Sequence, residues 1–261
     1  MLGEYLRRQI IEAKPDTIIH LQGHYSINER LTIDKPLSLI GVRGKSLLDC
    51  AMCFELKSQD QLVIRDVNIS RPEGIAGALV EIRNGRIDIS GCNFYERTHP
   101  LYLNGIIEGA RTLVLGGSLT GTVADCDVRR SDKAITVTDR ARPELVNNKL
   151  LHNRTAILYE QEAGGTARDN ICCRNERYGI EVNYNAVPEL EKNFCERNRL
   201  DGIRYSFQAK GGKALGNECN YNEGYGISYI SPSRLILENN NCRGNGRGDC
   251  RILEIVDDLV N

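Results

Sequence analysis

The stretch Asn170–Asn175, "NICCRN", is one of five related units in the C-terminal half of the chain. The others are "NKLLHN" from Asn148, "NFCERN" from Asn193, "NECNYN" from Asn217 and "NNCRGN" from Asn240. Each unit begins and ends with asparagine, and successive units start 22, 23, 24 and 23 residues apart. Such a fixed period indicates a repeat architecture in which each repeat stacks on its neighbours.

A second signature follows the first asparagine of each unit by eight or nine residues. It consists of a small residue and an apolar–variable–apolar alternation, as in "GIEV" at Gly179 and "GIRY" at Gly202. This alternation has the period of a β-strand. The predicted inward pairs are Ile135/Val137, Ile157/Tyr159, Ile180/Val182, Ile203/Tyr205 and Ile227/Tyr229.

Short strands with a period of about 23 residues predict an all-β fold, a parallel β-solenoid with one repeat per coil. Leucine-rich repeats have a similar period but need far more leucine than these units contain. Helical repeats are longer and do not alternate at period two.

Identical residues in stacked coils form columns with a spacing of ~4.8 Å. Two asparagine ladders are expected, because side-chain amides can bond along a stack and asparagine tolerates the left-handed backbone of tight turns. Their members are Asn148/170/193/217/240 and Asn153/175/198/222/245.

A third column contains Cys172, Cys195, Cys219 and Cys242. Zinc needs all its ligands about 2.3 Å from one centre, whereas four sulfurs in a ladder extend over ~14 Å. We therefore expect these thiols to fill the core, and we expect no metal site and no cofactor.

The earlier half of the chain is less regular. Coil-opening apolar residues are predicted at Phe54, Leu79, Leu101 and Ile135. The last interval is the longest, which predicts an excursion of about eleven residues beyond the repeat length in the segment 108–126. Insertions in solenoids map to loops, often on the functional face.

Both ends are predicted to carry caps, because an open solenoid end exposes core and unpaired strand edges. Residues Gly3–Ala13 place Leu6, Ile10 and Ile11 at helical spacing before Pro15. The predicted organisation is a capping helix within 1–15, a solenoid over 16–250 and a C-terminal cap over 251–261.

The segment "DTIIHLQGHYSINERLTIDKPLSLIGVRGKSLLDC", Asp16–Cys50, resembles the first coils of right-handed parallel β-helix proteins of the pectin-lyase-like superfamily. It is most similar to the branch found in nitrous-oxide-reductase accessory proteins and in the β-helix region of F-box ubiquitin-ligase subunits. The resemblance implies a right-handed parallel β-helix of about nine to ten coils. Superfamily members include polysaccharide lyases, hydrolases, epimerases and binding modules, so the fold alone does not choose between them.

Composition narrows the possible partners. The chain has 34 basic and 35 acidic residues, which argues against broad electrostatic binding of nucleic acid or anionic membrane. The N-terminus has no apolar run of signal-peptide length, and no segment reaches the roughly 20 apolar residues that cross a bilayer. We expect a cytoplasmic protein that does not bind membranes.

The outward side of the strands is the most enzyme-like surface. One predicted column is Thr136/Leu158/Glu181/Arg204/Ser228, and the next contains Glu160. Polysaccharide-active members of the superfamily use carboxylates with a basic residue on such a face, so Glu160, Glu181 and Arg204 are the catalytic candidates. Glu181 is expected to pair with Arg204 across adjacent strands, which weakens the catalytic interpretation.

A basic stripe of His152, Arg174, Arg197 and Tyr221 is the candidate binding surface. Our leading hypothesis is a non-catalytic recognition or scaffold module that presents a rigid strand face to a protein or a glycan. The alternatives are a carbohydrate-active enzyme and the recognition part of a larger signalling or defence protein.

Overall fold

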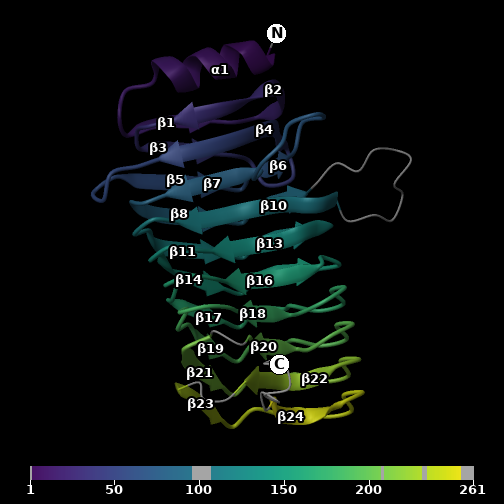
Figure 1. Cartoon of the computed structure of the whole chain (residues 1–261). Coiled ribbons are helices and arrows are strands. Elements are labelled where there is room, and N and C mark those ends of the chain that lie inside the picture. Colours follow the sequence, from purple (N-terminus) through teal and green to yellow (C-terminus); the bar gives the residue numbers. More distant parts are fainter. Residues whose placement is uncertain (1, 96–106, 207–208, 231–233, 254–261) are drawn as a thin grey trace, which may run out of the picture.

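The computed structural model describes residues 2–95, 107–206, 209–230 and 234–253, and these residues form a parallel β-solenoid with one short helix (Figure 1). Each coil carries up to three strands, which stack on the equivalent strands of neighbouring coils to give three faces, A, B and C. All the strand pairings between coils are parallel, with the partner residue one coil away. The predicted all-β solenoid is therefore confirmed.

Face A is a ten-stranded sheet with one strand from each successive coil. Its strands are β1 (Thr17–His20), β3 (Leu37–Ile40), β5 (Gln61–Arg65), β8 (Arg86–Ser90), β11 (Thr120–Ala124), β14 (Arg142–Val146), β17 (Thr166–Arg168), β19 (Glu189–Glu191), β21 (Gly211–Leu215) and β23 (Arg234–Glu238).

Faces B and C belong to a fourteen-stranded sheet. Its long strands β2 (Gly23–Ile33) and β4 (Ser46–Glu55) run through both faces. Face B continues with β6 (Asn68–Ser70), β9 (Asn93–Tyr95), β12 (Asp127–Arg129) and β15 (Lys149–Leu151), and then with single bridges at Ile171, Phe194, Glu218 and Asn241. Face C continues with β7 (Val80–Arg83), β10 (Ile107–Gly116), β13 (Ser131–Val137), β16 (Thr155–Tyr159), β18 (Ile180–Val182), β20 (Ile203–Tyr205), β22 (Tyr225–Ile230) and β24 (Gly248–Leu253).

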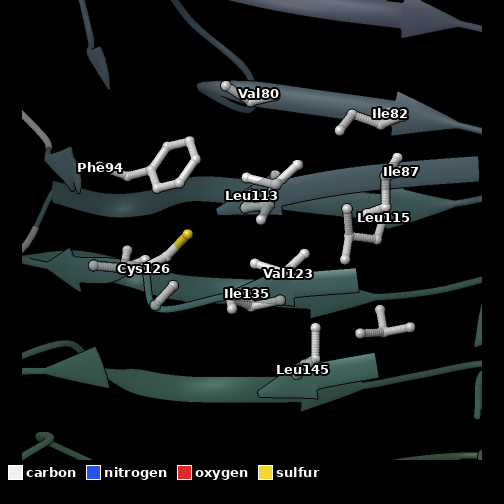
Figure 2. Close-up of a cluster of buried hydrophobic side chains, with 14 of the residues drawn as sticks. Val80, Ile82, Ile87, Phe94, Leu113, Leu115, Val123, Cys126, Ile135 and Leu145 are labelled. Carbon is white, nitrogen blue, oxygen red and sulfur yellow. The ribbon is translucent and has the colours of Figure 1, made fainter. Parts of the chain in front are cut away.

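The core fills the inside of the solenoid with one layer of apolar side chains per coil. Figure 2 shows such layers, in which Val80, Leu113 and Ile135 come from successive strands of face C. Nine of the ten predicted inward residues are at most 1 % exposed, and Tyr229 is partly buried against the core. The alternation in the repeats therefore predicted the core correctly.

The cysteine column also lies in the core. Cys172, Cys195 and Cys219 are fully buried, and Cys242 is half-buried in the last coil. Burial raises the pKa of Cys195 and Cys219 well above its usual value, so these thiols stay protonated and act as small apolar side chains.

Both asparagine ladders are present, and their members are buried except the last ones, Asn240 and Asn245, which are half-buried. In the first, Asn193 donates from Nδ2 to Asn217 Oδ1 at 3.0 Å, while its own Oδ1 accepts from Asn170 Nδ2 at 2.9 Å. Asn193 Oδ1 also accepts the backbone N–H of Asn170, and Nδ2 also donates to the backbone carbonyl of Ala167. The Asn193 amide therefore has all its donors and acceptors satisfied by adjacent coils, as buried polar groups require.

The left-handed backbone lies one residue before each ladder position, not at the asparagines themselves. Asp169 precedes Asn170 with φ 56°, and Arg174 precedes Asn175 with φ 56°. The tolerance of asparagine for left-handed backbone, one of our two reasons for expecting the ladders, is therefore not used at the ladder positions. Their side chains are committed to the stack, and the neighbouring residue makes the turn.

The insertion in the earlier half lies elsewhere than predicted. Residues 108–126 include the regular strands β10 and β11, and Leu113 is the coil partner of Ile135 at an offset of 22 residues. The offset from Val80 to Leu113 is 33, so the extra residues lie between β9 and β10. Leu101 lies outside the described residues, and Phe54 pairs with Ile82 instead of aligning with Leu79.

A helix covers the N-terminal end, as predicted. Helix α1 (Leu2–Glu12) buries Leu6 and Ile10 against the first coil, whereas Ile11 is 51 % exposed and does not contribute. At the other end, residues 251–253 belong to β24, and residues 254–261 of the predicted cap lie outside the described residues. No helix in the described part of the chain is long and apolar enough to cross a membrane.

The ladders predict a strong effect of a single substitution. Asn198 accepts from Asn175 and donates to Asn222 and to the carbonyl of Cys172, all inside the protein. Asn198→Val should lower the free energy of unfolding by about 3 kcal/mol or more, because it leaves buried donors and acceptors on both adjacent coils unpaired. Urea denaturation followed by circular dichroism would measure this loss.

Arg199→Val is the matched control, since Arg199 is the exposed neighbour in the same turn. It should change stability by less than about 0.5 kcal/mol. Equal stability of Asn198→Val and Arg199→Val would contradict a stabilising ladder.

Candidate functional site

The outer side of face C carries the candidate catalytic residues. Register places Thr136, Leu158, Glu181, Arg204 and Ser228 in one column, each the Cα partner of the next. The first two positions of this column are covered, since Thr136 and Leu158 are at most 2 % exposed although they point away from the core. Flanking side chains must therefore lie across it.

An ion pair spans this covered region. Arg111 of β10 and Glu160, which follows β16, approach to 3.4 Å, and their strands lie on either side of β13. The pair thus bridges two coils above Thr136, whose Oγ1 is buried and has no hydrogen-bond partner. Glu160 therefore forms an ion pair with Arg111, which the sequence did not lead us to expect as a functional residue.

A second cluster forms around Arg204. Its guanidinium lies 3.3 Å from Asp201 Oδ2, and Ser228 Oγ donates to the same oxygen at 2.6 Å. Asp201 Oδ1 accepts the backbone N–H of Tyr225 at 2.8 Å, so both carboxylate oxygens are bonded. Arg204 also lies 5.7 Å from the ring centre of Tyr178, a cation–π distance that further fixes the guanidinium.

Glu181 lies beside Arg204 but is not bonded to it. The two residues are Cα partners on β18 and β20, yet no ion pair joins them among the described side chains, and the expected cross-strand pair was wrong. Glu181 instead accepts from Asn183 Nδ2 at 3.3 Å. Arg204 turns to Asp201, whose carboxylate is nearly buried and needs a cation to offset its desolvation.

The structure thus brings Glu181 and Arg204 together and directs Glu160 toward Arg111. Sequence reasoning missed Asp201, Arg111 and Tyr178. A signal existed for Asp201, because the position before the small residue of each strand reads Tyr178, Asp201 and Tyr225 in successive coils. A carboxylate between two aromatics in a repeat marks a position where regular packing is broken.

The candidate binding residues form a separate column at the turn from face B to face C. His152, Arg174, Arg197 and Tyr221 are all exposed, and all four have left-handed backbone with φ between 54° and 57°. Phe194 lies nearby on face B and is 42 % exposed.

Comparison with known proteins supports the fold assignment. Residues 38–186 and 134–252 match the family described as "Right handed beta helix region". The chain belongs to this right-handed β-helix family. The family match also fixes the hand of the coils as the resemblance implied. No curated protein sequence matches this β-helix chain.

Two solved structures show how far the likeness of the β-helix extends. The periplasmic alginate epimerase AlgG shares 12 % identity with a TM-score of 0.65, over 100 % of this chain and 78 % of that one. The A-module of the Azotobacter vinelandii mannuronan C-5 epimerase AlgE4 shares 12 % identity with a TM-score of 0.52, over 97 % and 93 % of the two chains. At this identity the likeness concerns the fold alone.

In the described part of the chain, no three histidine, cysteine, aspartate or glutamate residues come together as possible metal ligands. The cysteines are all free, and six of them are buried. Burial raises the pKa of Cys50 to about 12, which makes its thiolate scarce at neutral pH.

Thiol reactivity tests this arrangement. In the native protein at pH 8, a disulfide reagent such as Ellman's reagent should react only with the four exposed or half-buried cysteines, Cys53, Cys173, Cys242 and Cys250. Cys242 should react slowest, because its hydrogen bond with Cys219 and its burial raise its pKa. All ten should react in denaturant, because unfolding exposes the buried sulfur atoms to the reagent. Rapid modification of Cys172 or Cys195 in the native protein, located by peptide mass mapping, would contradict a closed cysteine column.

Proposed function

We propose that this chain is a non-catalytic binding module and that the outer side of face C binds an extended polar ligand, a glycan. The main support is that two of the carboxylates there, Glu160 and Asp201, are already engaged in ion pairs. Glu160 pairs with Arg111, and Asp201 pairs with Arg204 and Ser228. Glycoside chemistry on paired carboxylates requires one group that can give a proton and another that can take one or attack.

The surface chemistry of face C favours a glycan over a protein. The large hydrophobic side chains that are exposed in the described residues lie elsewhere, on α1, on faces A and B and in the turns. Protein interfaces concentrate their energy in desolvated aromatic and apolar anchors. Face C instead presents guanidinium, carboxylate and amide groups, which suit hydroxyl-rich partners.

An acidic glycan is the first ligand class to test. Arg111 and Arg204 lie four strands apart on the same face, and a guanidinium binds a carboxylate through two parallel hydrogen bonds. The structurally similar AlgG and AlgE4 are epimerases of alginate and mannuronan, which makes alginate a reasonable first probe. The resemblance of Asp16–Cys50 to F-box recognition β-helices supports binding without catalysis.

The second candidate function is a carbohydrate-active enzyme that uses Glu160, Glu181 and Arg204. One observation favours it, because Glu181 and Arg204 lie side by side with the Tyr178 ring at 5.7 Å from the guanidinium. This arrangement places a cation next to a carboxylate that carries no ion pair among the described residues.

Glycan titration calorimetry tests the proposal with alginate, polygalacturonate and the neutral polymer dextran. We expect an acidic polymer to bind, and Arg204→Gln to weaken that binding at least tenfold, because the variant removes a fixed guanidinium from face C. None of the three polymers should be degraded or epimerised, as followed by reducing ends, the ultraviolet absorbance of unsaturated products and proton NMR.

Lys213→Gln is the matched control. Lys213 pairs with Glu189 at 3.2 Å on the outer side of face A, so the variant also removes one strand-face cation from an ion pair. It should leave glycan binding unchanged. Turnover that disappears in Glu160→Gln or Glu181→Gln would establish the enzyme alternative instead, and equal loss of binding in both arginine and lysine variants would contradict a site on face C.

A further inference from the structure

The turns that precede the two asparagine ladders each contain one residue with left-handed backbone, but the two turns use different residue types at that position. At the turn from face A to face B, one left-handed residue precedes each first-ladder asparagine or the equivalent position of an earlier coil, and seven of the eight residues are aspartate, asparagine or glycine. They are Asp66, Gly91, Asp125, Asn147, Asp169, Lys192, Gly216 and Asn239. At the turn from face B to face C, the equivalents are Arg130, His152, Arg174, Arg197, Tyr221 and Gly244, and only the glycine is of that kind.

The residue types at the second turn raise the free energy of the folded chain. A left-handed residue brings its Cβ close to the following carbonyl oxygen, and glycine avoids this clash while asparagine and aspartate offset it with local hydrogen bonds. Arginine and tyrosine have neither property. The first turn shows that this fold accepts the favourable residues, so their replacement at the second turn points to a role outside stability.

The side chains at the second turn are also unpaired. We name Arg130, His152, Arg174, Arg197 and Tyr221 the turn ridge. None of its cations forms an ion pair with the described residues, whereas the arginines of face C at positions 30, 83, 111, 154 and 204 are all paired with carboxylates. All five ridge residues are exposed, one per coil at a spacing of ~4.8 Å.

Apolar groups accompany these cations. Tyr221 is 60 % exposed. Phe194 is 42 % exposed and lies in the same coil as Arg197, three residues before it. Arginine and tyrosine, with neighbouring aromatic side chains, are the residue types that concentrate binding energy at protein interfaces. The ridge thus combines unpaired positive charge with exposed aromatic surface on one rigid edge.

We propose that the turn ridge is a docking surface for an acidic segment of a partner protein, one that carries apolar residues among its carboxylates. Glu196 and Glu218 lie on face B beside the ridge. They would repel a uniformly charged polyanion such as nucleic acid or a sulfated glycan, whereas a polypeptide can place apolar side chains there. This site is independent of the proposed glycan site on face C.

The experiment measures binding of a random glutamate–tyrosine copolymer by biolayer interferometry at low salt, with heparin and an oligo-dT strand as parallel probes. The copolymer should bind the wild-type chain more tightly than either other polyanion. The double variant Arg174→Asn/Arg197→Asn should bind it at least tenfold more weakly. The same variant should have a Tm higher by about 2–4 °C, because asparagine suits the left-handed backbone.

Lys192→Asn is the control that distinguishes a general effect of lost positive charge on copolymer binding from an effect specific to the turn ridge. Lys192 is an exposed cation with φ 51° at the other ladder turn. Its replacement should also raise Tm but leave copolymer binding unchanged. The proposal is overturned by unchanged copolymer affinity of the double variant, by an equal loss in Lys192→Asn, or by tighter binding of heparin or oligo-dT that depends on Arg174 and Arg197.

Discussion

The hydrogen bonds between stacked side-chain amides are the interaction on which the regular part of this structure depends. Each ladder asparagine is bonded to the coil before it and to the coil after it, as in the chain of bonds through Asn170, Asn193 and Asn217. Such a bond forms only if successive coils keep both their spacing and their register. The strands on either side of each ladder are thereby aligned, and the outward columns of face C follow from that alignment.

The ladders also determine where sequence variation is permitted. The inward strand positions must fill a narrow core, and the asparagine positions must complete a stack. What remains variable is the outward side of the strands and the residue before each asparagine. Face C uses this freedom for a network of paired charges around Arg111, Glu160, Asp201 and Arg204, whereas the turn ridge uses it for unpaired ones. The two surfaces therefore differ in whether their charged side chains are paired within the described residues.

Repetition explains which features could be predicted from the sequence. Where the asparagine units recur, the inward pairs, the cysteine column and the outward column through Glu181 and Arg204 were all predicted, because each coil provides the same evidence again. Before Asn148 this repeat is missing, and the strands β10 and β11 were taken for an excursion. The repeat pattern also could not predict which side chains pair. Arg204 pairs with Asp201 and not with Glu181, which depends on side-chain rotamers and on burial of the Asp201 carboxylate.

The covered N-terminal end has a consequence for how the chain is made. Helix α1 leaves the ribosome before every coil of the solenoid, and its side chains Leu6 and Ile10 offer an apolar surface against which the first coil can pack. Each later coil can then pack on a coil that has already folded, and its packing on that side needs no residues that are still to be synthesised. A solenoid closed at its start in this way can assemble at the pace of translation, so that only the newest coil exposes open strand edges to other chains.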